Sequence, residues 1–243
     1  MGMMGWLRTL ATRDEDQGAL GRHGMLLASL ILLLVALPVT QLIAGSSPRF
    51  QVLLTLVLVA AIIVNSRQRW IFIVAATVGA GAVAGIAFGQ TLNSVPILIA
   101  SDTLSLGLLG FTTLVMLNSL VQADEVSGDT IVGGICVYLL VGLCFAMVFL
   151  IMTEVYPGAF VAGGEAIARS AEDPSAHATR LLYFSFVTLT TLGYGDIAPV
   201  GDLAQMFAVA EALIGQLYLT IFVARLVALF AFQAGPDVED GRG

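Results

Sequence analysis

Six apolar stretches separated by short polar segments constrain the fold of this chain more than any other feature. They lie near residues 25–44, 51–66, 70–89, 95–121, 130–153 and 203–232. A helix needs about 20 apolar residues to cross the hydrocarbon core of a bilayer, so the stretch 51–66 is short and must rely on its flanks. Charged residues make up 11% of the sequence, whereas soluble domains carry about 25%. We therefore expect an all-α membrane protein with six transmembrane helices.

The short loops between these stretches predict how the chain is oriented. Apart from Arg49, their basic residues precede the first stretch or lie between the second and the third, at Arg8, Arg13, Arg22, Arg67 and Arg69. Basic loops tend to remain in the cytoplasm. Six crossings then place both termini in the cytoplasm and residues 154–202 outside. We expect a multi-pass protein of the plasma (inner) membrane, with membrane lipids among its partners.

The segment between the fifth and sixth stretches contains the run Thr191-Leu192-Gly193-Tyr194-Gly195-Asp196. Glycines at alternate positions reach left-handed backbone angles without a Cβ penalty. Such a backbone can point successive carbonyl groups the same way, and rings of carbonyl oxygens can replace the water around a dehydrated cation. The apolar part of this segment, residues 181–192, is too short to cross a bilayer. We predict a re-entrant helix and loop, surrounded by protein or water.

This run differs from the TVGYG loop of potassium-channel filters only by Leu192 in place of valine. Over roughly residues 131–233 the chain resembles the six-segment members of the tetrameric potassium-channel superfamily. The resemblance implies that K⁺ binds the carbonyl groups of Thr191, Leu192, Gly193 and Tyr194 and the Thr191 hydroxyl, with Gly195 completing the filter. One chain supplies one filter segment, and the known architecture needs about four. A homotetramer is therefore expected.

Residues around the filter are assigned by the same resemblance. Leu181–Thr190 is the predicted pore helix, whose C-terminal end favours a cation on the pore axis. Tyr183 and Phe184 are expected to brace the filter from behind, although simple packing would also explain them. Thr190 is expected behind the filter. Asp196 at the outer mouth either concentrates cations or accepts hydrogen bonds around the turn.

The last apolar stretch, residues 203–232, carries the remaining candidate residues. Gly215 is either a gating hinge, as the resemblance implies, or a site of close helix packing. Glu211 and Gln216 are polar at membrane depth, so Glu211 is expected either behind the pore helix or beside a cation-filled cavity. Arg225 is expected near the cytoplasmic end, where its side chain reaches toward the interface, binds an anionic headgroup or, only if the helix bends, pairs with Glu211.

The first four stretches lack the marks of a voltage sensor. A sensor needs several arginines in its fourth segment, but the stretch 95–121 has no Lys or Arg, and its one charged residue is Asp102. We expect either a charge-depleted relative of a sensor domain or an unrelated packing bundle. Asp102 would cap a helix, meet headgroups or bind a small cation. Residues 154–180 are predicted as a polar extracellular turret, with His177 in a solvated loop.

The expected organisation is a cytoplasmic segment 1–24, a four-helix bundle 25–122, a pore domain 130–232 and a short cytoplasmic tail 233–243. No attached ligand-binding domain is expected in so short a tail, and no nucleic acid without basic patches. We expect no catalysis and no cofactor, with K⁺ as the permeant ion. The predicted function is passive, K⁺-selective conduction without steep voltage gating. The alternatives are a weakly selective monovalent cation channel and a non-conducting membrane sensor or assembly subunit.

Overall fold

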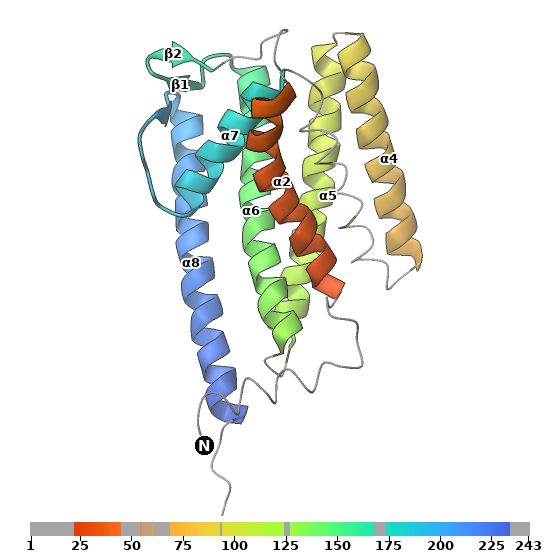
Figure 1. Ribbon diagram of the computed structural model, residues 1–243, viewed down its shortest axis with the longest axis vertical. Helices are drawn as coiled ribbons and strands as arrows, with labels where there is room; N and C mark the ends of the chain where they lie inside the picture. Colours follow the sequence, from red (N-terminus) through yellow and green to blue (C-terminus); the bar gives the residue numbers. More distant parts are fainter. Residues whose placement is uncertain are drawn as a thin grey trace, which may run out of the picture.

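The computed structural model describes residues 22–44, 54, 57, 60, 69–92, 94–123, 127–167 and 174–233. The helices in this part of the chain are α2 (Arg22–Ala44), α4 (Arg69–Thr91), α5 (Val95–Val121), α6 (Gly128–Val155), α7 (Pro174–Leu189) and α8 (Asp202–Gln233). The strands are β1 (Phe160–Ala162), β2 (Glu165–Ala166) and β3 (Ile197–Pro199). The long helices run side by side, and the shorter α7 lies between α6 and α8 near the strand-bearing end (Figure 1).

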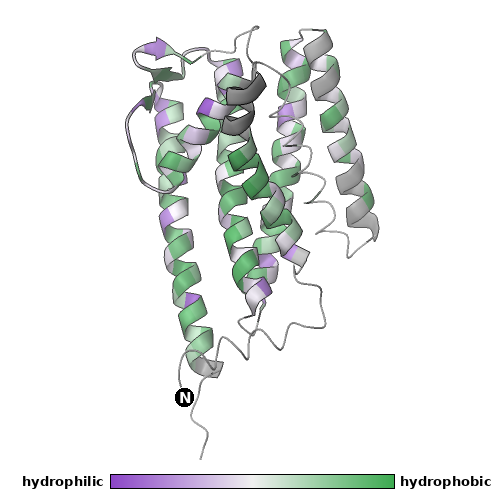
Figure 2. Cartoon of the chain, in the orientation of Figure 1, coloured by the Kyte–Doolittle hydropathy of each residue, from purple (hydrophilic) through white to green (hydrophobic). Residues whose placement is uncertain are grey.

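Three helices in the described part are long and apolar enough to cross a membrane, namely Val95–Val121, Gly128–Val155 and Asp202–Ala231. Figure 2 shows the apolar character running along most of their length. Both α2 and α4 have 23 residues, which at 1.5 Å per residue gives about 35 Å. Most of the stretch 51–66 lies outside the described residues, although Leu54, Val57 and Ala60 are helical and buried. The mainly helical membrane fold predicted from the apolar stretches is confirmed.

Local signals explain several helix boundaries. Pro96 stands in the first turn of α5, where a missing N–H costs nothing. Ser127 caps α6 by accepting a hydrogen bond from the Thr130 backbone N–H, and the Thr130 hydroxyl accepts one from Ser127. His23 at the start of α2 pairs with Asp129 at the start of α6, at 2.8 Å. The starts of α2 and α6 therefore lie at the same end of the bundle (Figure 1).

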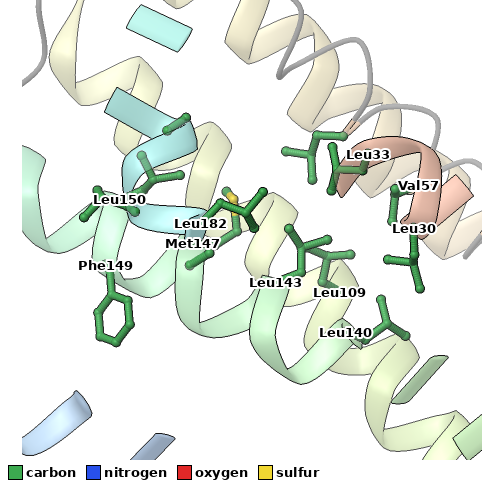
Figure 3. Close-up of a cluster of buried hydrophobic side chains, with 14 of the residues drawn as sticks. Leu30, Leu33, Val57, Leu109, Leu140, Leu143, Met147, Phe149, Leu150 and Leu182 are labelled. Carbon is green, nitrogen blue, oxygen red and sulfur yellow. The ribbon is translucent and has the colours of Figure 1, made fainter. Parts of the chain in front are cut away.

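Helix α6 is the centre of the molecule, because it packs against α2, α5, α7 and α8. Apolar side chains from several helices form one buried cluster around it (Figure 3). Its members include Leu30, Leu33, Val57, Leu109, Leu140, Leu143, Met147, Phe149, Leu150 and Leu182. The most apolar part of α6 is 56% buried within the chain, but that of α8 is only 6% buried. Helix α8 thus presents most of its surface to whatever surrounds the single chain.

Buried hydroxyl groups on α5 bond within their own helix. Ser101, Ser105, Thr112 and Thr113 each donate to the carbonyl group four residues earlier, at 2.7 to 2.9 Å. Each of these buried hydroxyl groups therefore has a hydrogen-bond acceptor within its own helix. Asp102 is half-buried on the same helix. The structure leaves its three predicted roles open.

The segment after α6 forms a small sheet that the sequence did not predict. Strand β1 pairs antiparallel with β2 and with β3, and Val161 lies opposite both Ala166 and Ala198. The prediction that His177 lies in a solvated loop is wrong. Because α7 begins at Pro174, His177 is helical and buried, and its Nε2 lies 2.8 Å from the Thr153 hydroxyl of α6.

Candidate functional site

The run Thr191–Asp196, called the filter run below, follows shortly after α7. Two neighbouring helices hold the end of α7. Helix α7 begins seven residues before the predicted pore helix and ends at Leu189. Tyr138 of α6 donates a hydrogen bond to the Leu189 carbonyl group at 3.3 Å. Gly215 of α8 lies against the same residue so closely that a Cβ added there would meet Leu189 Cδ1 at 2.9 Å and overlap the carbonyl oxygen. The end of α7 is therefore fixed between α6 and α8.

Backbone N–H groups of the filter run point back toward α7. The N–H groups of Leu192 and Gly193 both donate to the Val187 carbonyl group, with N–O distances of 2.9 and 3.4 Å. In a planar trans peptide, the N–H and the carbonyl group of the preceding residue point in opposite directions. The carbonyl groups of Thr191 and Leu192 therefore point away from α7. This is the direction that the cation-binding hypothesis requires.

Every second residue of the run has a left-handed backbone. The φ angles are 59° at Thr191, 57° at Gly193 and 78° at Gly195. A β-branched residue in this region costs about 1–3 kcal/mol, and such strain tends to occur at functional sites. The Thr191 hydroxyl accepts a hydrogen bond from Gln216 Nε2 at 3.0 Å, which links the filter to α8. Alternating handedness turns successive carbonyl groups toward one side.

The filter run lies on an uncovered edge of the single chain. Residues 190–196 are all exposed, with 58% of Leu192 and 68% of Tyr194 accessible. Exposed apolar and aromatic side chains grouped in this way commonly mark an interaction surface. The site as seen in one chain is therefore a half-open row of backbone oxygens rather than an enclosed pocket.

Tyr183 and Phe184, which were predicted to act as a pair, lie in different environments. Tyr183 is exposed and lies beside Asp196 at the filter mouth. Desolvation, the hydrogen bond that the Tyr183 hydroxyl donates to the Asp196 carboxylate, and the negative charge of that carboxylate raise the pKa of the Tyr183 hydroxyl. Phe184 instead joins Phe149 and Phe160 in a cluster with ring centroids 5.1 to 5.2 Å apart. Only Tyr183 is thus in reach of the filter mouth, while Phe184 anchors α7 to α6 and β1.

Thr190 directly follows the end of α7, and Gly215 of α8 packs against that end. The Thr190 hydroxyl donates to the Phe186 carbonyl group at 2.6 Å, within the last turn of the helix. Helix α8 is continuous from Asp202 to Gln233 through Gly215. The close approach to Leu189 accounts for a glycine at this position through packing alone. A hinge at Gly215 stays a prediction.

Glu211 lies behind the pore helix, which is one of its two predicted places. It is fully buried, and its Oε1 is 2.5 Å from the Ser185 hydroxyl of α7. Ser185 also lies 2.6 Å from the Gly142 carbonyl oxygen of α6. Ser185 does not stand out in the sequence, because the two residues of this contact are 26 positions apart. The contact between this polar residue of the pore helix and the buried acid becomes apparent only when the packing of the two helices is known.

Arg225 was predicted to reach toward the interface, but its side chain bonds to the end of α5 instead. Its guanidinium group donates to the Leu120, Val121 and Ala123 carbonyl groups at the end of α5, with distances of 2.8 Å to Val121 and 2.7 Å to Ala123. The last carbonyl groups of a helix lack partners and carry a partial negative charge, so they favour a cation. Arg225 therefore links the end of α5 to α8.

Comparisons with known proteins agree with this arrangement. Residues 137–231 match a family of proteins described as ion channels. The voltage-gated potassium channel Kch of Escherichia coli is 36% identical over 59 residues, which are 24% of this chain and 12% of that protein. The two pore potassium channel c of Oryza sativa subsp. japonica is 37% identical over 59 residues, or 24% of this chain and 13% of that protein.

A shorter segment resembles a human protein. The voltage-gated delayed rectifier potassium channel KCNH5 of Homo sapiens is 52% identical over 42 residues, which are 17% of this chain and 4% of that protein. The chain thus matches between 4% and 13% of the length of these three relatives. No solved structure matches the chain.

Proposed function

We propose that this chain, through its residues 137–231, belongs to the tetrameric potassium-channel superfamily and is a channel protein rather than an enzyme. The function is passive, selective conduction of K⁺ through a pore whose filter is the run Thr191–Gly195. The family match and the potassium channels among its relatives support this proposal. The finer steps rest on the geometry of the filter.

The observation that carries the proposal is the left-handed backbone at Thr191, Gly193 and Gly195, together with filter N–H groups that bond to the end of α7. This backbone favours a row of carbonyl oxygens facing one way, from Thr191 to Tyr194. Such oxygens replace the hydration shell of K⁺, and several weak sites in a row allow ions to displace one another. The C-terminal end of α7 adds a partial negative charge.

One chain supplies only one side of such a pore, so the functional form is a homotetramer with four-fold symmetry. The uncovered filter edge supports this assembly, since its apolar side chains need a neighbour. Helix α8 supports it too, because large apolar residues are exposed along its whole length in the single chain. They include Leu203, Met206, Val209, Leu213, Leu217, Ile221, Val223 and Val227.

In this proposal the chain crosses the plasma (inner) membrane six times, and both termini lie in the cytoplasm. His23 and Asp129 meet at one end of the bundle, so the chain between them crosses an even number of times. Of the helices between them, α2, α4 and α5 are described. In this proposal, a fourth crossing that includes the helical residues Leu54, Val57 and Ala60 makes the number even. The filter then opens toward the outside.

Conduction is not steeply dependent on voltage in this proposal. Helix α5 contains no Lys or Arg, and its buried hydroxyl groups bond to their own helix. A transmembrane voltage therefore has little charge in α5 to act on. The Arg225 contact with the end of α5 gives the first four segments a direct mechanical link to α8.

The experiment that tests the function is K⁺ flux from liposomes of the purified protein, followed by bi-ionic reversal potentials in planar bilayers. We expect K⁺ flux and a clear preference over Na⁺. Gly193→Ala, at φ 57°, should abolish both. Gly164→Ala is the matched control, because this glycine has φ 89° but lies in the turn between β1 and β2.

Two results would reject the proposal in favour of its alternatives. Equal K⁺ and Na⁺ permeability indicates a weakly selective monovalent cation channel. No flux in any lipid or at any voltage indicates a non-conducting sensor or assembly subunit. Loss of flux in both glycine variants would show that the assay reports damage to the fold rather than the filter backbone.

A further inference from the structure

Glu211 is a fully buried acid that the conduction pathway does not use. It lies on α8 and contacts α7. Helix α7 packs against both α8 and α6 (Figure 1). The Oε1 atom of Glu211 contacts the Ser185 hydroxyl at 2.5 Å. Its Oε2 is buried and has no hydrogen-bond partner among the described residues. An acid at this depth is costly and calls for a physical explanation.

The geometry around Ser185 determines the protonation state of Glu211. The Ser185 oxygen lies 2.6 Å from the Gly142 carbonyl oxygen and 2.5 Å from Glu211 Oε1. A serine hydroxyl has one hydrogen to donate, and a carbonyl group only accepts. If Glu211 were ionised, one of these short contacts would join two oxygens without a hydrogen. Both contacts are hydrogen bonds only if the carboxyl group is protonated and donates to Ser185.

The surroundings of Glu211 also favour the neutral form. Among the described residues, no Lys, Arg or His nitrogen forms an ion pair with the Glu211 carboxyl group. A buried, unpaired carboxylate costs far more than a buried neutral acid. Besides Glu211, the titratable or charged groups on the three packed helices are Asp129, Cys136, Tyr138, Cys144 and Glu154 of α6, His177, Arg180 and Tyr183 of α7, and Asp202, Tyr218 and Arg225 of α8.

This site lies directly behind the filter. Ser185 is one helical turn before Leu189, the last residue of α7. Gly142 allows α6 to approach here, since a Cβ at this position would meet Phe186 at 2.9 Å and Leu189 at 3.1 Å. A single hydroxyl group thus joins three helices close to the carbonyl groups that hold the filter N–H groups. A shift of α7 against α6 or α8 would displace the filter oxygens.

We propose that Glu211 is a positioning residue of the filter, whose protonated carboxyl group donates to Ser185 while Ser185 donates to the Gly142 carbonyl group. This relay clamps the end of α7 between α6 and α8. The inference rests on the proposed pore function, although the protonation of Glu211 does not. The two are therefore tested separately.

The protonation is tested by infrared spectroscopy of the purified protein at neutral pH. We expect the C=O stretch of a buried carboxylic acid, shifted in D₂O because the proton is hydrogen-bonded. Glu211→Gln should remove this band, and Ser185→Ala should shift it. A band that Glu211→Gln leaves unchanged would overturn the inference. This result stands whether or not the wild-type protein conducts.

The positioning role is tested by K⁺/Na⁺ permeability ratios. Glu211→Leu and Ser185→Ala should each lower the ratio by about fivefold, the factor that corresponds to one net hydrogen bond. Glu211→Gln should retain the wild-type ratio, because its amide donates to the same hydroxyl group. Ser105→Ala is the matched control, since this buried serine bonds within α5 at 2.9 Å. Equal losses in Glu211→Gln and Glu211→Leu would overturn the role.

A pH series separates the relay from simple packing. The wild-type ratio should fall at the alkaline pH where the acid band disappears, because ionised Glu211 can no longer donate to Ser185. Glu211→Gln should show no such fall in that range. Identical pH profiles would contradict the relay even if both variants fold. If the wild type shows no K⁺ flux at all, the pore function fails, and the infrared result alone decides the state of Glu211.

Discussion

Replacement of Gly215 by alanine distinguishes close packing from hinge bending. An added Cβ would lie 2.9 Å from Leu189 Cδ1 and would overlap the carbonyl oxygen of the same residue. Carbon atoms in ordinary contact are about 3.5–4.0 Å apart, so α8 must recede from α7 by roughly 0.6–1 Å. Such overpacking costs about 1–3 kcal/mol. We therefore expect lower thermal stability of the assembled protein and reduced K⁺ flux.

The matched control for this variant is Gly107→Ala on α5. Nothing lies within 4 Å of a Cβ at Gly107, and alanine is favoured over glycine inside a helix by about 1 kcal/mol. Gly107→Ala should therefore leave stability unchanged or raise it. Thermal melting in detergent and liposome flux are measured on both variants. If Gly215→Ala melts at or above the wild-type temperature and alters only channel opening, the packing argument is refuted and the hinge is favoured.

Four further predictions follow from the contacts around the pore. Arg225→Gln should destabilise the chain by about 2 kcal/mol, because charged hydrogen bonds are lost. In thermal melting, Arg225→Lys should recover only part of this lost stability, because lysine lacks the planar guanidinium group. Phe184→Ala should cost about 3–5 kcal/mol, whereas exposed Phe111→Ala should change stability by less than about 0.5 kcal/mol. Gln216→Leu should weaken K⁺ binding about fivefold in calorimetric titrations, and an unchanged affinity would refute its bond to the filter threonine. Replacing K⁺ by a large organic cation should lower the melting temperature, since K⁺ at 100 times its Kd stabilises the folded protein by about 2.7 kcal/mol. The same exchange should leave the melting temperature of Gly193→Ala unchanged.

The long helices were predictable from sequence because apolar length is a local property. Helix α5 has the predicted bounds, and α8 extends by one residue at each end of the predicted stretch. The left-handed angles at Gly193 and Gly195 also follow from local residue type. Each of these features depends on the residue itself or on its immediate neighbours, so spacing alone reveals it.

The contacts that hold the filter were not predictable in the same way. Arg225 bonds to carbonyl groups more than 100 positions earlier, and backbone carbonyl groups leave no mark in a sequence. Ser185 looks like an ordinary residue of an apolar helix until Glu211 faces it. His177 was misplaced for a related reason, since the polar segment before α7 conceals the early start of that helix. The type of a buried polar residue indicates that it needs a hydrogen-bond partner. Which residue is that partner depends on how the helices pack.

The three-stranded sheet has a consequence for the order in which the protein is made. Strand β3 follows the filter, yet it pairs with β1, which precedes α7, and the Val200 N–H also donates to the Ala159 carbonyl group at 2.9 Å. The polypeptide between these strands is thus a closed loop whose closure awaits the synthesis of residues 197–200. Until the ribosome has passed this point, α7 has only its upstream partners, and a nascent chain stopped before Ile197 would carry the run Thr191–Asp196 without the strand that closes its loop.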